Sequence, residues 1–447
     1  MRRARRRWAP ALLALCVATH AGCAAPVNDA DAGAAAADDD ASAGTPVDPV
    51  VLAAAAAAAA KAIELDFLLD RIAVLAHDDF NGRDNGSPGG IAARGWLRAD
   101  LGNHGVEPLA AAGFDLPFDA GVNLCAVVRG SDPTLRGELV LLGAHYDHLG
   151  NADDPGSQCK AAAEAKDRIC NGAIDNAAGV AVGLAVLRAL AASNPRPRRS
   201  VGICLFDAEE DGLLGSKDFV AKASAPDAGA PGAPGPWPLS AVAAMFSVDN
   251  VGSQIVPGEP SSFATDAEFS DGLRAAVHAA NASGVAGDFV TWPVSSFFVG
   301  QEGGGRSDHL PFREAGVPVL FLGSGSSSVY HTTADEQDAI DTSKLLAIAR
   351  HSTVLVAAVA NADARPDFVQ TPQPHLDDAR ALVSIADRVL ADPAAVGVPG
   401  AAVDLVQGWR DELQAWIDTP PQTAEQWASY QSLVQTIIKT VFAFISG

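Results

Sequence analysis

The pattern of hydrophobic and polar positions predicts strands that alternate with helices along most of the chain. Short apolar runs, of the length of buried strands, lie at 122–128, 138–144, 200–206, 239–248 and 317–322. Apolar residues recur at helical spacing at 51–76, 91–101, 177–192, 213–223, 267–280 and 342–361. The first two strands flank a Gly-Ser-Asp-Pro turn and are expected to form a hairpin. The alternation predicts an α/β fold, with a mixed or parallel sheet covered by helices on both faces.

Composition marks the boundaries of this predicted domain, 49–362. Residues 24–48 contain almost no large apolar side chain, so they cannot bury enough surface to fold and predict a flexible tether. Residues 363–375 are predicted to be a linker. Beyond them, 376–447 predict a C-terminal helical extension, with helices near 376–391, 402–417 and 423–445.

The N-terminus has the pattern of a bacterial export signal. A basic stretch precedes a short apolar run that closes on Ala21, Gly22 and Cys23, so 1–23 are predicted to be a signal peptide. A cysteine after small residues resembles a lipobox, which makes Cys23 the expected lipid-bearing first residue of a cell-envelope lipoprotein. His20 stands where lipoboxes usually carry leucine, so a freely secreted protein is the alternative.

The net charge and the cysteines limit the classes of binding partner and the cellular compartments that fit this sequence. The net charge of −23 argues against nucleic acid, and membrane contact is expected only through a lipid anchor at Cys23. In an exported protein, cysteines are expected to pair. Cys159 and Cys170 flank a short polar loop and are predicted to form a disulfide. Cys125 and Cys204 lie in apolar strands and are expected to be buried thiols, with a second disulfide as the alternative.

Potential metal ligands stand at strand ends or in loops in five places. They are His145, Asp175, the pair Glu209 and Glu210, Asp249 and His331. Each alone has an ordinary explanation, such as an N-cap aspartate or an exposed loop histidine. Together they are expected to converge, because an α/β sheet gathers its functional groups at the carboxyl ends of its strands.

Imidazoles and carboxylates without a thiolate suit catalytic Zn²⁺, with Co²⁺ or Mn²⁺ as substitutes. Five protein ligands are too many for one open catalytic zinc but suit two zinc ions, with one carboxylate shared. Asp175 has two oxygens and can bridge two cations. Of the adjacent Glu209 and Glu210, one is expected to bind a metal while the other stays free as a base. Asp147 is expected to accept the second ring N–H of His145.

Six local sequences (HYDH, DNAAG, FDAEEDGLLGS, VDN, SDHLPF and YHTTAD) resemble, in this order, those of the M28 family of zinc aminopeptidases over roughly 60–362. The resemblance implies an open, mixed, mostly parallel sheet of about eight strands between helices. It also implies removal of N-terminal residues from peptides with a free N-terminus. The resemblance implies that His145 and Asp249 bind one zinc ion, that Glu210 and His331 bind the other, and that Asp175 bridges the two. It also implies that Glu209 is the general base. Asp147 is implied to orient His145.

The chain departs from the family near the oxyanion, because no tyrosine matches the one that some members place there. Arg306, His309 or the metals would take its role, and Asp308 is implied to lie behind the ligands or on the substrate side. Two alternatives remain: a glutaminyl cyclase, similar in fold and ligand order but with one zinc, and a lipid-anchored relative without enzymatic activity. The paired glutamates favour an enzyme, because a binding protein needs no free base.

Overall fold

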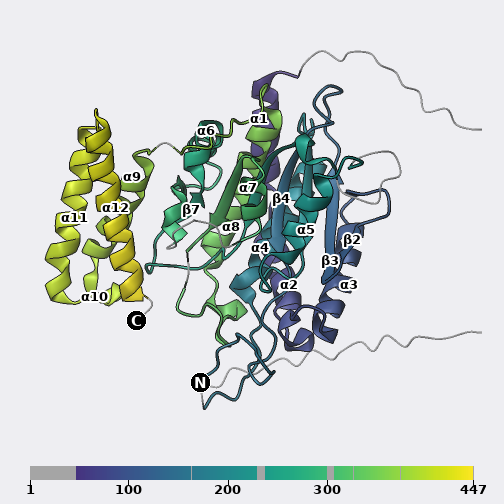
Figure 1. The fold of residues 1–447 in the computed structure, drawn as a ribbon, viewed down its shortest axis with the longest axis horizontal. Coiled ribbons are helices and arrows are strands. Elements are labelled where there is room, and N and C mark those ends of the chain that lie inside the picture. The colour runs from purple at the N-terminus through teal and green to yellow at the C-terminus, as the bar shows by residue number, and fades with distance from the viewer. Residues whose placement is uncertain are drawn as a thin grey trace, which may run out of the picture. The chain divides into compact units, whose positions relative to one another are not determined.

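An open sheet of nine strands runs through the protein (Figure 1). The computed structural model describes residues 47–445 except 163, 229–236, 300–306, 326 and 373. The predicted signal peptide, the lipidation site Cys23 and Arg306 therefore lie outside the described residues. The strands are β1 Glu107–Pro108, β2 Asp115–Phe118, β3 Gly121–Val128, β4 Leu139–His145, β5 Ser200–Phe206, β6 Val242–Val248, β7 Ser261–Thr265, β8 Val290–Pro293 and β9 Val319–Gly323.

The strand order is β1-β3-β5-β4-β6-β9-β7-β8, and β2 also pairs with β3. Strands β5, β4, β6 and β9 form a continuous parallel block, and β7 pairs in parallel with β8. Strand β3 is antiparallel to its neighbours β1, β2 and β5, and β7 is antiparallel to β9. The sheet is therefore mixed and open, as predicted, with nine strands instead of about eight.

The predicted hairpin between the first two long strands is wrong, because β5 lies between β3 and β4. This order also corrects the prediction that Cys125 and Cys204 are buried thiols. The two cysteines are directly opposite each other in the antiparallel pair of β3 and β5, with Cα atoms 4.2 Å apart, and they form a disulfide. Opposed residues of an antiparallel pair come this close where they do not exchange hydrogen bonds. The predicted disulfide between Cys159 and Cys170 is confirmed.

Helices cover both faces of the sheet (Figure 1). The core on one face of the sheet includes residues of α1 Pro49–Lys61, α2 Leu65–Leu75, α3 Pro88–Gly102, α4 Gly179–Ala192, α6 Asp271–Ala282 and α8 Thr342–Asn361. The other face packs against α5 Leu214–Ala223 and α7 His309–Glu314. Alternate residues of β4 divide between the two cores: Val140 and Leu142 face the first set of helices, and Leu139 and Leu141 the second. Because both faces are covered, β4 is buried along its whole length.

The long helix predicted at 51–76 is two helices, α1 and α2, separated by a short break at 62–64. The break lets both helices bury apolar residues, such as Ala56 in α1 and Leu68 and Ile72 in α2, in one core. Strands β1, β2, β7 and β8 were not predicted, because they are short and lack a strong apolar run. The other predicted strands and helices are present with boundaries that differ by a few residues.

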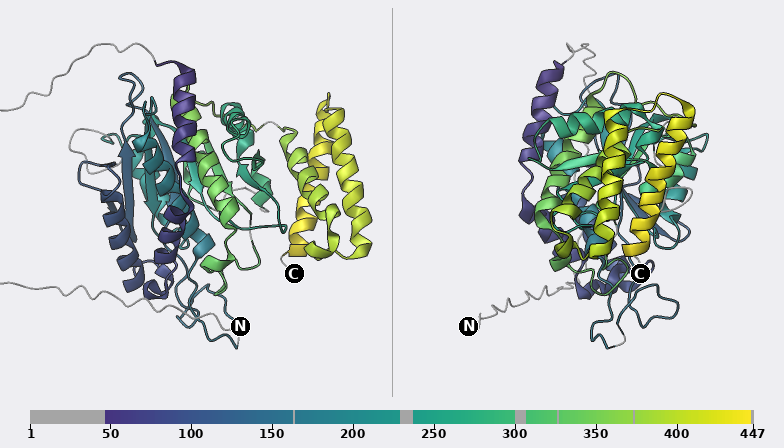
Figure 2. Two further views of the ribbon diagram at one scale, coloured as in Figure 1. Left: turned by 180° about the vertical axis from the view of Figure 1, so that it is seen from behind. Right: turned by 90° about the vertical axis from the view of Figure 1, so that its left-hand side faces the viewer.

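The C-terminal extension consists of α9 Asp377–Ala391, α10 Pro393–Val396, α11 Gly400–Asp418 and α12 Ala424–Ile445 (Figure 2). These helices share a small apolar core that includes Leu413 and Tyr430. Helix α9 contacts the edge strand β8. The buried carboxylate of Asp378 accepts hydrogen bonds from the backbone N–H and the hydroxyl of Ser295, at 2.8 and 2.6 Å. The extension is thus bonded directly to the loop that follows β8.

Replacing both Cys125 and Cys204 with alanine should lower the free energy of unfolding by about 2–4 kcal/mol, because a link between residues 79 apart restricts the unfolded chain. The matched control replaces both Cys159 and Cys170, which are only 11 residues apart and should cost less. Denaturant unfolding followed by circular dichroism measures both losses. Free thiols at Cys125 and Cys204 in non-reducing peptide mapping would contradict the bridge.

Candidate metal centre

Four parallel strands bring predicted metal ligands to one edge of the sheet. His145 is the last residue of β4, and Asp249 directly follows β6. Glu209 and Glu210 follow β5 after a short turn, and His331 lies in the loop after β9. Because β4, β5, β6 and β9 run parallel, their carboxyl ends meet at this edge.

Asp175, in the turn that leads into α4, lies between the two histidines. Its Oδ1 is 3.2 Å from Nε2 of His145, and its Oδ2 is 3.3 Å from Nε2 of His331. Nε2 of His145 is also 3.5 Å from Oδ1 of Asp249, and Nε2 of His331 is 3.3 Å from Oε2 of Glu210. The structure therefore brings the five predicted ligands together, and each histidine contacts a different oxygen of Asp175.

These separations suit a metal ion. In a tetrahedral zinc site with bonds of about 2.0–2.1 Å, neighbouring ligand atoms lie about 3.3 Å apart. Ligand atoms of His145, Asp175 and Glu210 all lie within 4.8 Å of one another, and so do those of His145, Glu209 and Asp249. Nε2 of His331 is buried and faces the carboxylates of Asp175 and Glu210, so once deprotonated it can share a metal ion with them. The imidazoles and carboxylates present here fit zinc.

The crowded carboxylates change the proton affinities of the centre. Burial alone would lower the pKa of His331, but the neighbouring carboxylates of Asp175 and Glu210 raise it to about 9. Burial alone would raise the pKa of Glu210, but the neighbouring imidazoles of His148 and His331 outweigh it and lower that pKa to about 2. Burial, joined by repulsion from Glu210, raises the pKa of Glu209 well above its usual range. One glutamate therefore stays charged while its neighbour readily holds a proton.

The carboxylate of Asp147 holds the glutamate pair more directly than it holds His145. Its two oxygens accept hydrogen bonds from the backbone N–H groups of Glu209 and Glu210, each at 3.1 Å. Nδ1 of His145 is 3.2 Å from the main-chain oxygen of Asp147 and 3.7 Å from its carboxylate. Asp147 thus contacts His145, as expected from the sequence, mainly through its backbone, while its side chain links the end of β4 to the turn after β5.

His148 was not predicted as a site residue, and it contacts Glu210. Its Nδ1 lies 2.8 Å from Oε1 of Glu210, while Oε2 of the same glutamate faces His331. The imidazole is fully buried. Because His148 occupies one oxygen, Glu210 is oriented to present the other one to a metal. The signal in the sequence was the second histidine of HYDH, three residues after His145.

Asp335 and Arg83 position the turn that carries Asp175. The carboxylate of Asp335 accepts hydrogen bonds from the backbone N–H groups of Ile174 and Asp175, at 2.8 and 3.0 Å. The buried guanidinium of Arg83 donates to four main-chain oxygens, of Leu75, Tyr146, Asn171 and Gly172. Burial lowers the pKa of Arg83 to about 10, so it remains charged near the acidic centre. Neither residue was predicted from the sequence.

The remaining predicted residues divide between the centre and its surroundings. Asp308 is fully buried, and burial raises its pKa to about 7, with repulsion from Asp147 and Asp249 adding to the effect. His309 lies with other partners: its Nε2 is 3.2 Å from Oδ2 of Asp266, and its ring contacts Phe321. The structure therefore associates Asp308, but not His309, with the predicted ligands.

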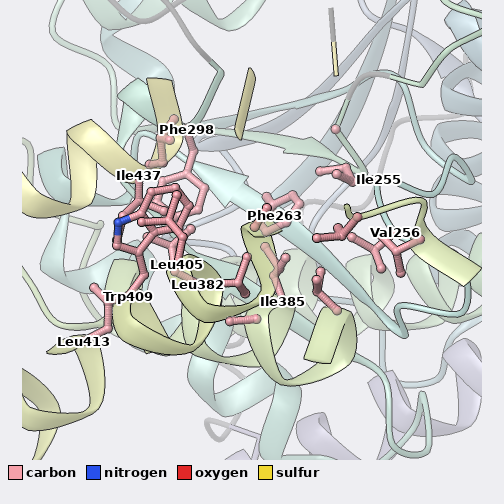
Figure 3. Close-up of a pocket in the computed structure, with 18 of the residues that line it drawn as sticks. Ile255, Val256, Phe263, Phe298, Leu382, Ile385, Leu405, Trp409, Leu413 and Ile437 are labelled. Carbon is pink, nitrogen blue, oxygen red and sulfur yellow. The ribbon is translucent and has the colours of Figure 1, made fainter. Parts of the chain in front are cut away.

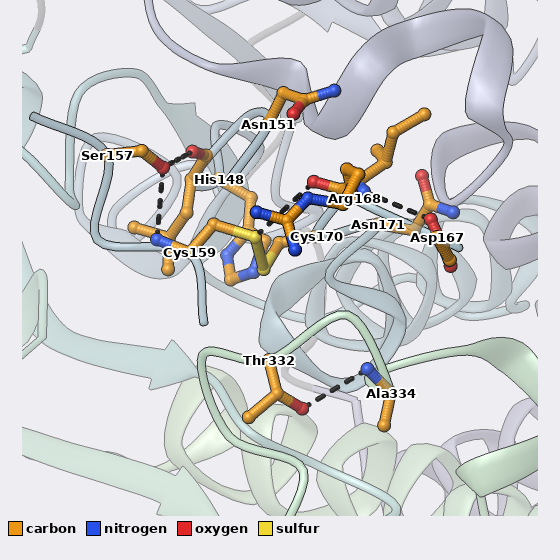
Figure 4. Close-up of a disulfide and its surroundings, with 12 residues drawn as sticks. His148, Asn151, Ser157, Cys159, Asp167, Arg168, Cys170, Asn171, Thr332 and Ala334 are labelled. Atoms are coloured by element: carbon orange, nitrogen blue, oxygen red, sulfur yellow. Dashed lines mark hydrogen bonds between the residues drawn. A yellow bond between two sulfur atoms is a disulfide. The ribbon is translucent and has the colours of Figure 1, made fainter. Parts of the chain in front are cut away.

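The loop closed by Cys159 and Cys170 borders the centre beside His331 (Figure 4). The backbone N–H of Lys160 donates to the main-chain oxygen of His331 at 2.9 Å, and the N–H of Thr333 donates to the oxygen of Lys160 at 3.0 Å. The ring of Tyr330 stacks on that of His331 with centroids 3.8 Å apart. The disulfide loop thus pairs with the loop that carries the last predicted ligand.

Replacing His148 with phenylalanine should weaken zinc binding by about 10–100-fold, because Glu210 loses the hydrogen bond that orients it. His148→Asn is the matched control, since its side-chain amide can still donate near the Nδ1 position and should retain most of the affinity. Competition with a chromogenic chelator measures both constants. Equal zinc affinity in wild type and His148→Phe would show that the contact does not position the ligand.

Comparison with curated proteins finds relatives that are similar to this chain over part of its length. Two curated relatives are glutaminyl-peptide cyclotransferase of Bos taurus, 30% identical over 235 residues, and leupeptin-inactivating enzyme 1 of Streptomyces exfoliatus, 25% identical over 263 residues. The matches cover 48% and 58% of this chain, and the chain spans 60% and 48% of the length of these relatives.

A solved structure, that of the LapA aminopeptidase of Legionella pneumophila, shares the fold with a TM-score of 0.53 and 16% identity. The superposition covers 69% of this chain and 75% of that one. The family model described as peptidase family M28 matches residues 123–356, more than half of the chain. That segment contains all five predicted ligands. The chain therefore belongs to peptidase family M28.

Proposed function

We propose that this protein is an aminopeptidase with two zinc ions, which removes N-terminal residues from peptides. The observation that carries the proposal is the position of Asp175, with one carboxylate oxygen toward His145 and the other toward His331. Under this proposal His145 and Asp249 hold one ion, His331 and Glu210 hold the other, and Asp175 is shared. Co²⁺ and Mn²⁺ are expected to substitute for zinc.

Zinc bound here would supply Lewis acidity and lower the pKa of a bound water toward neutrality. The chain itself supplies the group that moves the proton. Glu209 is buried beside the ligands, and burial with repulsion from Glu210 gives it a raised pKa. Its carboxylate would accept a proton from the attacking water and return it to the leaving amine. The backbone N–H bond to Asp147 holds the residue in place for both steps.

Excess negative charge favours a substrate with a free N-terminus. Asp147, Asp175, Glu209 and Asp249 are all buried around the centre, and Asp308 lies with them. Even with two divalent cations bound, this edge of the sheet retains carboxylates that can attract an ammonium group. An uncharged internal peptide bond gains nothing from that field, so the site is suited to an exopeptidase.

A glutaminyl cyclase activity, with one zinc, is the second candidate. It is favoured by the 30% identity to the bovine glutaminyl-peptide cyclotransferase. Against it stands Asp175, whose two oxygens face separate histidines, because a centre with one ion has no need for a shared carboxylate.

We also infer that the protein is exported, as a lipoprotein anchored at Cys23 or in secreted form, and the two disulfides support an oxidising compartment.

The purified protein should release p-nitroaniline from aminoacyl p-nitroanilides and lose this activity on treatment with 1,10-phenanthroline, because the reaction depends on bound zinc. Activity should return when Zn²⁺ or Co²⁺ is restored. A peptide with N-terminal glutamine serves as the competing substrate, with its cyclisation followed by mass spectrometry. Cyclisation without hydrolysis of any anilide or peptide would replace the proposal by the second candidate.

Glu209→Gln should keep zinc but lose about 10²–10⁴-fold in kcat, because the amide cannot accept the proton of water. Asp211→Asn, a change to an exposed acid two residues away, is the matched control and should leave kcat unchanged. Steady-state kinetics with a peptide substrate and metal analysis of the same samples give both values. Near-normal turnover by Glu209→Gln would rule out its role as the base.

A further inference from the structure

The loop between Cys159 and Cys170 has little apolar core of its own. None of the described residues between the two cysteines is buried. The buried apolar cluster beneath the loop consists of Leu149 and the two cysteines themselves. An ion pair between Arg168 and the exposed Asp153, at 2.7 Å, adds little stability because water screens it. The disulfide is therefore the main buried contact of this loop.

The two ends of the loop are held by different parts of the protein (Figure 4). The backbone N–H of Cys170 donates to the oxygen of Gly150 at 3.0 Å, and the buried Arg83 binds the main-chain oxygens of the two residues after Cys170. At the other end, the backbone N–H of Cys159 donates to the hydroxyl of Ser157, which belongs to the same surface segment. The disulfide thus connects the exposed end of the loop to the framework around Arg83.

The residue after Cys159 is bonded to the loop that carries His331. The backbone N–H of Lys160 donates to the oxygen of His331 at 2.9 Å, and the oxygen of Lys160 accepts from the N–H of Thr333 at 3.0 Å. His331 has a φ of 58°, a left-handed conformation that is uncommon for residues other than glycine. Such a conformation persists where the surrounding contacts hold it. The bonds to Lys160 are contacts of this kind.

The two histidines of the centre are therefore held in different ways. His145 is the last residue of β4, which is buried and paired with β5. His331 lies in a loop, and its Nε2 is 3.3 Å from a carboxylate oxygen of Asp175 and 3.3 Å from one of Glu210. Because a change in φ swings the side chain, relaxation of the backbone at His331 would turn its imidazole away from both carboxylates. A ligand set needs its geometry held within about 0.5 Å.

We propose that the disulfide between Cys159 and Cys170, acting through Lys160, positions His331 for metal binding. The proposal rests on the proposed function, because it takes His331 as a zinc ligand. Loss of the disulfide frees the backbone of His331 and weakens the site to which this histidine belongs. The site beside His145 is spared, because the ends of sheet strands hold its ligands.

The first test removes the disulfide by replacing both Cys159 and Cys170 with alanine. The zinc affinity of one site should fall at least tenfold while that of the other stays at the wild-type value, as measured by competition with a chromogenic chelator. Replacement of both Cys125 and Cys204 with alanine is the matched control. It costs more stability but should leave both zinc constants unchanged. A folded variant without the Cys159–Cys170 disulfide that keeps both constants would overturn the proposal.

A double-mutant cycle identifies the affected site. In a His331→Ala background, removal of the Cys159–Cys170 disulfide should leave the remaining zinc constant unchanged, because the effect passes through His331. An equal loss of affinity with and without His331 would show that the disulfide only stabilises the protein in general, and the positioning role would be wrong.

Lys160→Pro interrupts the same connection without a change to the cysteines, because proline has no N–H to donate to the oxygen of His331. Lys160→Ala keeps this N–H and removes an exposed side chain, so it is the matched control. Lys160→Pro should lower the same zinc constant at least tenfold and alter the visible spectrum of the Co²⁺-loaded protein. Lys160→Ala should change neither. Peptide mapping checks that the disulfide is still formed in both variants.

The zinc stoichiometry separates this proposal from the proposed function. If the wild type binds a single zinc ion and Lys160→Pro weakens it, the positioning role stands and the proposal of two zinc ions fails. If the wild type binds two ions and folded Lys160→Pro keeps both wild-type constants, the positioning role is overturned while the proposed function stands. Circular dichroism and thermal unfolding check that every variant is folded.

Discussion

The burial of several carboxylates at one edge of the sheet is the constraint on which the rest of the centre depends. Asp147, Asp175, Glu209 and Asp249 are each less than 10% exposed, and the imidazoles beside them are those of His145, His148 and His331. Like charges in a poorly solvated site repel strongly unless protons, cations or hydrogen bonds offset them. Under the proposed function, metal ions held between the acids and the imidazoles would offset this repulsion, with one oxygen of Asp175 toward each.

The part of this repulsion that a metal does not offset is met by the protein itself. The carboxylate of Asp147 accepts two backbone N–H groups, and that of Asp335 accepts two more, so each acid is neutralised in part by the segment that it positions. The buried cation Arg83 binds four main-chain oxygens on the segments that lead to the centre. These contacts join β4, the turn after β5 and the turn before α4 into one hydrogen-bonded frame. The ligands can therefore keep their geometry although they come from loops.

Much of the fold and most of the ligands could be predicted from the sequence, for a physical reason. Apolar runs such as that of β4 report burial on both faces of a sheet, and parallel strands place the residues after them at a common edge, so the convergence of His145 with Asp249 follows from the pattern. The hydrophobic pattern does not determine which strands lie next to each other in the sheet. Strand β5 lies between β3 and β4, and only this order makes Cys125 and Cys204 face each other.

Contacts that side chains make between different loops could also not be predicted from the sequence. His148 bonds Glu210 because two strand ends lie side by side, and Asp335 reaches the backbone of Asp175 across 160 residues of chain. The position of α11 opposite β7 and β9 depends on where the C-terminal helices pack. Their amphipathic pattern does not determine that packing. The hydrophobic pattern predicted that these helices exist, but not that they share a cavity with β7 and β9 (Figure 3).

The central claim is that Asp175 is shared between two metal ions, and crystallography at the zinc absorption edge tests it most directly. The account predicts two anomalous peaks about 3.5–4 Å apart, one beside His145 and the other beside His331, with a carboxylate oxygen of Asp175 next to each. A single peak in crystals grown with excess zinc, with one of these histidines unliganded, would contradict it.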